Sequence, residues 1–259
     1  MRGFICVLLM LVTERVSSSL ADKVLPLGIE NFPPFEYTVD DTVRGVDADI
    51  VRDVLKMAGY KVEFKVMPWS RVQALADTGK LAGLFSLTIT EQRREKYYFS
   101  EPINQVKDVF FKLAEANIDW NELTDLNGYA IVVGQGYQYA PEFMSAMKNR
   151  SLWPVSSVSG DSVVYRQLSY LVAKRADLAL CEISVCQYLI RQHSPKFDGI
   201  DYIDKPVGDI RPYFIAFSKK WPNAGELVAE FNHHLRLYLN SGRHKPVFER
   251  YGVTPFNSP

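Results

Sequence analysis

Apolar and polar residues alternate along the N-terminal part of the chain with two different periods. Residues 24–29, 61–67 and 81–87 form short apolar or alternating runs, which are typical of strands. Between these runs, apolar residues recur at helical spacing at Ile50, Val51, Val54, Leu55 and Ala58, and again at Val72, Leu75 and Ala76. Asp47 stands where the cap of the first helix is expected. Strands that alternate with helices predict a mostly parallel α/β sheet.

A second unit of similar build follows residue 100. A long strand is expected over residues 106–114, and the segment 125–136 contains a turn at Asn127-Gly128 followed by an apolar strand. A helix over Ser162–Lys174 and a strand over Leu178–Cys181 continue this unit. The chain is therefore expected to form two α/β bodies.

The C-terminal part of the chain completes this division. Residues 211–220 are expected to form a further strand, and Pro222 opens a helix with apolar positions at Leu227, Val228, Phe231 and Leu235. We expect two lobes, the second inserted in the first, formed by residues 22–112 with 209–259 and by residues 113–208. Two hinge strands are expected near residues 109–115 and 207–216.

The first residues have the pattern of a secretory signal peptide. Arg2 precedes the apolar run Phe4–Val12, and small residues follow up to Ala21. The apolar run is shorter than the roughly 20 residues that a membrane-spanning helix needs. We expect residues 1–21 to be removed, so that the mature protein begins at Asp22 and is located in the periplasm.

Composition narrows the class of protein and of partner. The 259 residues are 47% hydrophobic and 23% charged, which is typical of a globular protein and excludes a disordered or fibrous chain. Basic and acidic residues are equal in number, at 30 each, so no net charge attracts nucleic acid or an anionic membrane.

Cys181 and Cys186 are either a disulfide of an exported protein or two buried thiols. No histidine stands near them at the spacing of a metal site.

The stretch Leu87–Ser100, LTITEQRREKYYFS, places hydroxyl groups and a guanidinium at the end of an apolar strand. In an open α/β sheet, ligands bind in the crevice at the carboxyl ends of the strands. Thr90 can cap a short helix and leave Arg93 in its first turn, where free N–H groups and the planar guanidinium favour an anion. Thr88 can donate a further hydrogen bond. These residues predict a carboxylate site.

Further candidates follow the other predicted strands. Phe32 lies on a proline-stiffened loop after the first strand, and Trp69 follows a later one. In the second unit, Gln135 and Gly136 follow one strand and Glu182 follows another. Glu182 can accept hydrogen bonds from an ammonium group, while Phe32 and Trp69 offer apolar faces to a side chain. Together with the carboxylate site, these residues predict a pocket for an α-amino acid.

The chain resembles the polar amino-acid binding proteins of bacterial extracellular solute-binding family 3, from about Val24 to Tyr251, in the strings PPFEY, GVDADIVRDVL and SLTITEQRREKYYFSEP. The most specific element is T-I-T-x-x-R followed by F-S-x-P. The resemblance implies a two-lobed periplasmic binding protein fold of type II. It also implies that Thr88 and Arg93 hold the ligand carboxylate and that Phe32 and Trp69 stack on the ligand. The family's glycine-containing loop of the second lobe corresponds to Gln135-Gly136.

Three positions depart from the family pattern. Glu182 stands where the family has an aspartate that takes the amino group of the ligand, and Ala82 replaces another aspartate. Ser86, which we include in the predicted ligand site, replaces a frequent glycine. Glutamate keeps the charge but is one methylene longer than aspartate. The ligand is therefore either placed differently or not an ordinary α-amino acid.

Each candidate residue also has a simpler explanation. Arg93 can be a surface arginine that pairs with a neighbouring glutamate. Trp69 and Phe32 can be ordinary core residues, and Glu182 can be a solvated charge at the end of a strand. Only the positions of these side chains in the structure can separate a shared pocket from these alternatives.

The leading hypothesis is a monomeric receptor that captures an amino acid or a related carboxylate between its lobes. Closure would then be recognised by an ABC transporter permease in the inner membrane. We expect no catalytic residue, metal, cofactor or nucleic-acid partner. Two alternatives stay open. One is a cyclohexadienyl or prephenate-type dehydratase on the same scaffold, with Glu182 as general acid; the other is a ligand sensor for a separate signalling partner.

Overall fold

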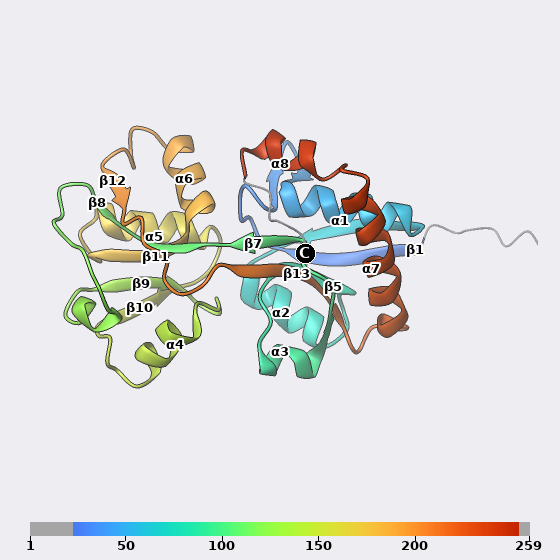
Figure 1. Cartoon of the computed structure of the whole chain (residues 1–259), viewed down its shortest axis with the longest axis horizontal. Coiled ribbons are helices and arrows are strands. Elements are labelled where there is room, and N and C mark those ends of the chain that lie inside the picture. Colours follow the sequence, from blue (N-terminus) through green and yellow to red (C-terminus); the bar gives the residue numbers. More distant parts are fainter. Residues whose placement is uncertain (1–22, 254–259) are drawn as a thin grey trace, which may run out of the picture.

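The computed structural model describes residues 23–253, which form two lobes lying side by side (Figure 1). Among these residues, the first lobe contains a six-stranded sheet and a separate two-stranded sheet, and the second lobe contains a five-stranded sheet. Both larger sheets have mixed strand direction and helices packed against them. The α/β fold class predicted from the sequence is thus confirmed. The predicted signal peptide, residues 1–21, lies outside the described residues. Among residues 23–253, no helix is both long enough and apolar enough to cross a membrane.

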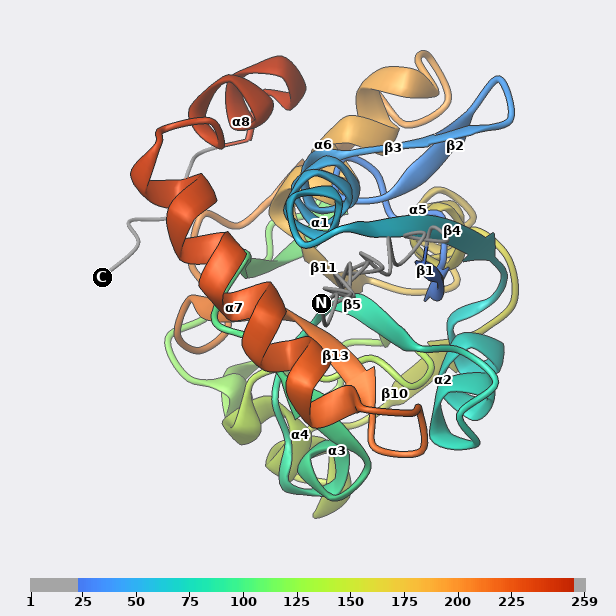
Figure 2. The same ribbon diagram turned by 90° about the vertical axis from the view of Figure 1, so that its right-hand side faces the viewer.

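The first lobe combines the N-terminal part of the chain with its C-terminal helices. Its elements are β1 (Lys23–Ile29), β2 (Tyr37–Val39), β3 (Thr42–Arg44), α1 (Val46–Met57), β4 (Tyr60–Val66), α2 (Trp69–Asp77), β5 (Gly83–Leu87), α3 (Glu91–Lys96), β6 (Tyr97–Phe99), β7 (Asn104–Val106), β13 (Arg211–Ser218), α7 (Ala224–Asn240) and α8 (Lys245–Tyr251). The strand order is β4-β1-β5-β13-β6, with β7 also paired to β13. Apolar residues of α1 and α7 pack in one core cluster, whereas those of α2 pack in another with β5. Figure 2 shows these three helices around the strands of the first lobe.

The second lobe is formed by the middle of the chain. Its elements are β8 (Asp108–Leu113), η1 (Leu123–Leu126), β9 (Ile131–Gly134), α4 (Pro141–Lys148), β10 (Val155–Val158), α5 (Val163–Val172), β11 (Leu178–Glu182), α6 (Ile183–Gln192) and β12 (Ile200–Tyr202). The strand order is β10-β9-β11-β8-β12, in which β9 is parallel to β10 and β11 while β8 is antiparallel to β11. The carboxyl ends of β9 and β11 therefore lie at the same edge of this sheet.

The chain crosses between the lobes twice. β7 ends at Val106 in the first sheet, and β8 begins at Asp108 in the second. The expected boundary at residue 112 falls inside β8, whose partners β11 and β12 are both strands of the second sheet. The return crossing leads into β13, which pairs with β7 from Arg211 onwards (Figure 1). Arg211 also forms an ion pair with Asp108, so the two crossings are tied together.

Asp47 does not cap α1, contrary to the expectation from the sequence. The helix begins at Val46 with Gly45 as its N-cap, and Asp47 lies buried in the first turn. Its carboxyl group accepts a hydrogen bond from the Asn104 amide (2.9 Å) and lies 2.7 Å from the Ser86 hydroxyl. The side chain of Asp47 is therefore used for contacts with β5 and β7 rather than for the free N–H groups of its own helix.

Close approach of β5 and β13 requires glycine at position 83. A Cβ atom added to Gly83 would lie 2.5 Å from the backbone carbonyl oxygen of Ala216, which belongs to the paired strand and cannot turn away. By contrast, a Cβ atom added to Gly199 in the second lobe would meet no atom within 4 Å.

Gly83→Ala is expected to lower the free energy of unfolding by about 1–3 kcal/mol, because the added methyl group overpacks a buried strand pair. Gly199→Ala is the matched control and should change stability by less than about 0.5 kcal/mol. Urea unfolding followed by circular dichroism measures both. Equal stability of the two variants would contradict the close approach of β5 and β13.

Candidate functional site

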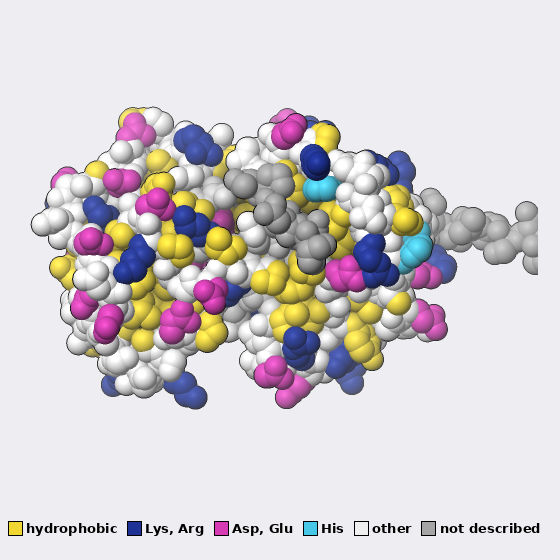
Figure 3. Space-filling model, in the orientation of Figure 1, with side chains coloured by type: hydrophobic (Ala, Val, Ile, Leu, Met, Phe, Trp, Pro, Cys, Tyr) yellow, Lys and Arg dark blue, Asp and Glu magenta, His cyan; other side chains and the backbone are white. Residues whose placement is uncertain are grey.

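A cavity lies between the two lobes, and the centre of a water molecule can occupy about 50 Å³ of it. Its first-lobe wall contains Glu30, Phe32, Glu36, Trp69, Ser86, Thr88, Arg93 and Tyr213, and its second-lobe wall contains Asp108, Tyr137, Gln138, Tyr139, Gln167 and Glu182. Many of these residues lie at or just after the carboxyl ends of β1, β5, β9 and β11. On the outer surface, acidic and basic side chains are interspersed over both lobes, without a large region of one sign on the face shown in Figure 3.

Arg93 is a buried cation in the cavity wall. Thr90 is the N-cap of α3, and its hydroxyl accepts a hydrogen bond from the Arg93 backbone N–H (3.1 Å), as the sequence predicts. The Arg93 guanidinium donates to the carbonyl oxygen of Thr88 (2.8 Å) and lies over the Trp69 ring, 5.9 Å from its centroid. Only 7% of Arg93 is exposed, and burial lowers its pKa to about 10.

No carboxylate neutralises Arg93 within the described part of the chain. The ion pairs among residues 23–253 all involve other side chains, and Glu91 pairs with Arg94 instead. The guanidinium has five N–H donors, and one bond to Thr88 leaves most of them free for another acceptor. A planar, desolvated guanidinium with free donors is suited to a carboxylate, which it can bind through two parallel hydrogen bonds.

Phe32, Trp69 and Thr88 are all buried in the cavity wall. Phe32 packs edge-on against Tyr137 of the opposite lobe, with ring centroids 6.0 Å apart. Thr88 follows β5 directly and supplies the carbonyl that orients Arg93. The structure thus brings together the aromatic residues and the residues that the sequence predicts to bind an anion.

Ser86 has an unusual backbone conformation, with φ of +56°. Such a φ is uncommon for residues other than glycine, which accounts for the glycine that the related family often has here. The conformation coincides with an irregularity in the pairing of β5 with β13. The Ser86 hydroxyl contacts the carboxyl groups of both Glu36 and Asp47. Ser86 therefore connects the cavity wall to the buried first turn of α1.

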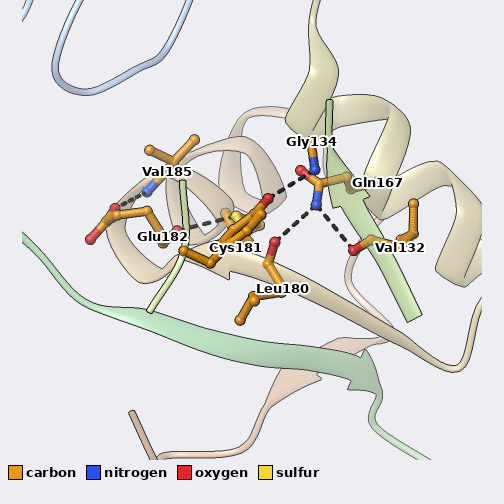
Figure 4. Close-up of a disulfide and its surroundings, with 9 residues drawn as sticks. Val132, Gly134, Gln167, Leu180, Cys181, Glu182 and Val185 are labelled. Carbon is orange, nitrogen blue, oxygen red and sulfur yellow. Dashed lines mark hydrogen bonds between the residues drawn. A yellow bond between two sulfur atoms is a disulfide. The ribbon is translucent and has the colours of Figure 1, made fainter. Parts of the chain in front are cut away.

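Glu182 lies at the junction of β11 and α6, where it is the N-cap of the helix. Its Oε2 atom accepts a hydrogen bond from the Val185 N–H (2.9 Å), and burial raises the pKa of its carboxyl group to about 8 (Figure 4). Cys181 and Cys186 form a disulfide across the same junction. The side-chain amide of Gln167 on α5 donates a hydrogen bond to the carbonyl oxygen of Leu180 on β11 (2.9 Å). Glu182 is thus a carboxyl group held rigidly at the cavity.

Gln135 and Gly136 do not line the cavity, contrary to the expectation from the sequence. Both are exposed on the loop after β9, where Gly136 has φ of +78° and approaches α2 of the first lobe. The turn at Gly136 instead directs the following residues, Tyr137, Gln138 and Tyr139, into the cavity wall. The loop predicted from the family is therefore close to the site, but the side chains in contact with the cavity come from the next three positions.

Sequence reasoning missed two acidic residues of the wall, Glu30 and Glu36. Glu30 follows β1 and is 8% exposed; burial raises its pKa to about 8, and the Tyr137 hydroxyl donates a hydrogen bond to it. Glu36 is 1% exposed, and burial together with the charges of Asp47 and Glu30 raises its pKa well above the usual value. The rule that ligands bind at strand ends could have identified Glu30, which follows β1 directly.

The arrangement offers hydrogen-bonding groups and charges rather than a metal centre. Within residues 23–253, no group of three or more histidine, cysteine, aspartate and glutamate side chains is placed to hold a metal ion. The cavity combines a free guanidinium, several buried carboxyl groups and aromatic rings from both lobes. Such a set can enclose a small polar ligand that carries charges of both signs.

Comparison with known proteins agrees with this chemistry. A sequence profile described as "Bacterial extracellular solute-binding proteins, family 3" matches residues 25–254. A "Probable histidine-binding protein" of Neisseria gonorrhoeae is 22% identical over 224 residues, which cover 85% of this chain and 79% of that protein. Alignments with several other amino-acid binding proteins span about half the length of each.

Solved structures with the same fold include "An ancestral arginine-binding protein bound to arginine", with a TM-score of 0.76 and 23% identity, over 88% of this chain and 97% of that one. "The ancestral amino acid-binding protein AncCDT-1, a precursor of cyclohexadienyl dehydratase" has a TM-score of 0.72 and 20% identity, over 88% and 95% of the two chains. At these identities the likeness concerns the fold alone, and it confirms the two-lobed binding-protein fold predicted from the sequence.

The buried carboxyl groups should make the ligand-free protein less stable as the pH rises. Burial raises the pKa values of Glu30 and Glu182 to about 8 and that of Asp47 to about 7, from ordinary values of 4.5 and 3.8. The folded protein therefore binds more protons than the unfolded chain in this range, and this stabilisation is lost as the pH rises through the folded-state values.

We expect the melting temperature of ligand-free protein to fall between about pH 5 and pH 8, as measured by differential scanning calorimetry. Glu30→Gln should reduce this fall, because one buried titrating group is removed. Glu249→Gln, at an exposed position on α8, is the control and should leave the pH profile unchanged. A melting temperature that rises steadily over the same range would contradict the assignment of buried neutral carboxyl groups.

Proposed function

Because the chain belongs to the bacterial extracellular solute-binding proteins of family 3, we propose that it captures an amino acid or a related small carboxylate between its lobes for uptake by an ABC transporter. The free guanidinium of Arg93 in the interlobe cavity carries this proposal. A buried cation without an anionic partner is costly, and a ligand carboxylate would supply that partner.

The ligand would bridge the two lobes. Its carboxylate would be held by Arg93 and the Thr88 hydroxyl on the first lobe, and its ammonium group by Glu182 on the second. Phe32 and Trp69 would pack against the rest of the ligand. Contacts with both lobes favour the closed arrangement over an open one, which is the differential binding that drives closure. In this proposal the two sheets move as separate lobes, which divide between β7 and β8 rather than at residue 112, with the hinge near residues 107 and 210.

The proposal extends to location and partner. Residues 1–21 would direct export, and the mature protein would act as a monomer in the periplasm, where a permease of the inner membrane recognises the closed form. We favour binding over catalysis because the relatives reported above are named as binding proteins. In addition, the Glu182 carboxyl group already caps α6, which is a structural role that does not require proton transfer.

Arg93→Ala should weaken ligand binding by more than about 1.5 kcal/mol, the usual worth of hydrogen bonds to a charged group. Arg94→Ala is the matched control, because the Arg94 side chain lies next to Arg93 in the sequence but is half exposed and forms an ion pair with Glu91. Isothermal titration calorimetry against amino acids measures both affinities. The role assigned to Arg93 fails if its replacement and that of Arg94 have the same small effect.

Purified protein should leave prephenate and arogenate unchanged. Phenylpyruvate formed from prephenate is measured at high protein concentration by its absorbance in alkali, in which prephenate itself is stable, and phenylalanine formed from arogenate is measured by chromatography. Product formation that is lost in Glu182→Gln would replace the transport proposal with the dehydratase alternative.

A further inference from the structure

The cavity contains more carboxyl groups than a simple amino acid can use. Four acidic side chains line it, namely Glu30, Glu36, Asp108 and Glu182, whereas Arg93 is the only basic side chain among the described residues of its wall. Asp108 is neutralised by Arg211. If a bound amino acid pairs its carboxylate with Arg93 and its ammonium group with Glu182, two carboxyl groups are left without a cation.

These two carboxyl groups, Glu30 and Glu36, lie together on the first-lobe side of the cavity. They flank the loop that carries Phe32, and this loop is closed by hydrogen bonds between the backbones of Phe32 and Glu36. Each carboxyl group is at least nine-tenths buried, and none of the ion pairs among residues 23–253 includes either of them. The surrounding groups are neutral donors or further acids.

The carboxyl groups of Glu30 and Glu36 are surrounded by hydroxyl groups and by other acids. Glu30 faces the Tyr137 hydroxyl of the second lobe and the charge of Glu36. Glu36 faces Asp47 of α1 and the Ser86 hydroxyl of β5, and Asp47 in turn accepts from the Asn104 amide. No lysine, arginine or histidine of the described chain is among these contacts. A cation on the ligand would be the first positive charge in this part of the cavity.

Proton counting shows that one carboxyl group of this cluster is protonated. Ser86 has one hydroxyl proton, yet its oxygen contacts a carboxyl oxygen of Glu36 and another of Asp47. The hydroxyl can donate to only one of them, so the second contact requires a carboxyl group that is itself protonated. Asp47 also accepts from Asn104, which favours its charged form and places the proton on Glu36.

We propose that the ligand of this cavity is an α-amino acid whose side chain carries a cationic group, and that Glu30, with Glu36 behind it, binds that group. This inference rests on the proposed function, since it takes the amino-acid backbone to be held by Arg93 and Glu182. A cationic side chain would pair with a carboxyl group that the protein otherwise buries in protonated form, and would favour its ionised form. The aromatic rings of Phe32 and Tyr137 beside Glu30 provide faces for an ammonium, guanidinium or imidazolium group.

The assignment has a consequence for protons. A cation placed next to Glu30 favours its ionised form, so binding at neutral pH should release protons into the buffer. A neutral ligand of the same shape would leave Glu30 protonated and release none. Proton release therefore reports contact of the ligand charge with this group, which a purely structural role of Glu30 would not produce.

The test is calorimetric titration of the purified protein with matched pairs of ligands. Ornithine, lysine, arginine and histidine are compared with norvaline, norleucine, citrulline and glutamine, which have neutral side chains of similar size. Agmatine, which is arginine without its carboxylate, tests the backbone site separately. We expect at least one cationic amino acid to bind 10-fold or more tightly than its neutral counterpart, and agmatine to bind more weakly than arginine.

Two variants identify the group that selects the charge. Glu30→Gln should abolish the preference for the cationic ligand, so that the ratio of the cationic to the neutral affinity falls to within about 3-fold of one. Asp161→Asn removes an exposed carboxylate at a neighbouring surface pocket that Glu30 also lines, and should keep the preference. Titration in two buffers of different ionisation enthalpy should show proton release by the wild type and less by Glu30→Gln. Thermal melts confirm that both variants are folded.

The outcomes separate this inference from the function on which it rests. If neutral and cationic amino acids bind equally well and Arg93→Ala weakens both, the cation site is overturned and amino-acid binding stands. If no amino acid of either kind binds, both fall. If the preference or the proton release persists unchanged in Glu30→Gln, the cation is bound elsewhere and the assignment to Glu30 is overturned.

Discussion

The pairing of β13 with β5, β6 and β7 is the constraint on which the rest of the architecture depends. β13 returns from the second lobe and takes a place inside the first sheet, so the chain must leave that sheet after β7 and come back to it. The second lobe is thereby held by two adjacent crossings. The ion pair between Arg211 and Asp108 joins these crossings next to the cavity, and both residues are largely shielded from water.

Burial of charge is the second organising feature. The cavity wall places one free guanidinium opposite a larger number of carboxyl groups, and desolvation shifts their pKa values in the direction that removes charge. A protein core of this size would be more stable with apolar groups at these positions. Their presence in a cavity shared by two lobes is understood when the missing partners are supplied by a ligand, since the same desolvation that destabilises the empty site strengthens each contact with a bound one.

Local chemistry explains which parts of the structure could be predicted from the sequence. The cap of α3 by Thr90 and the position of Arg93 depend on residues three apart, so the pattern alone indicated them. The alternation of strands and helices likewise gave the α/β class. By contrast, the first turn of α1 was misread because Asp47 satisfies the distant groups Ser86 and Asn104, and a contact of this kind leaves no periodic signal. The choice of Tyr137 over Gln135 depends on a single left-handed residue, Gly136, that reverses the loop. The acidic cluster could not be predicted either, because Glu30, Glu36 and Asp47 come from separate segments and each has the pattern of an ordinary polar position.

The disulfide at the junction of β11 and α6 makes the order of the site depend on the redox state of the compartment in which the chain folds. Cys181 and Cys186 fix the short turn that presents Glu182, so this carboxyl group does not have to be ordered when a ligand arrives. Such a bond forms and persists where thiols are oxidised and is rare where they are kept reduced. A chain that folds in a reducing compartment would therefore have both lobes but a looser second-lobe wall. If the protein is exported as proposed, the binding site would be completed only where Cys181 and Cys186 are oxidised.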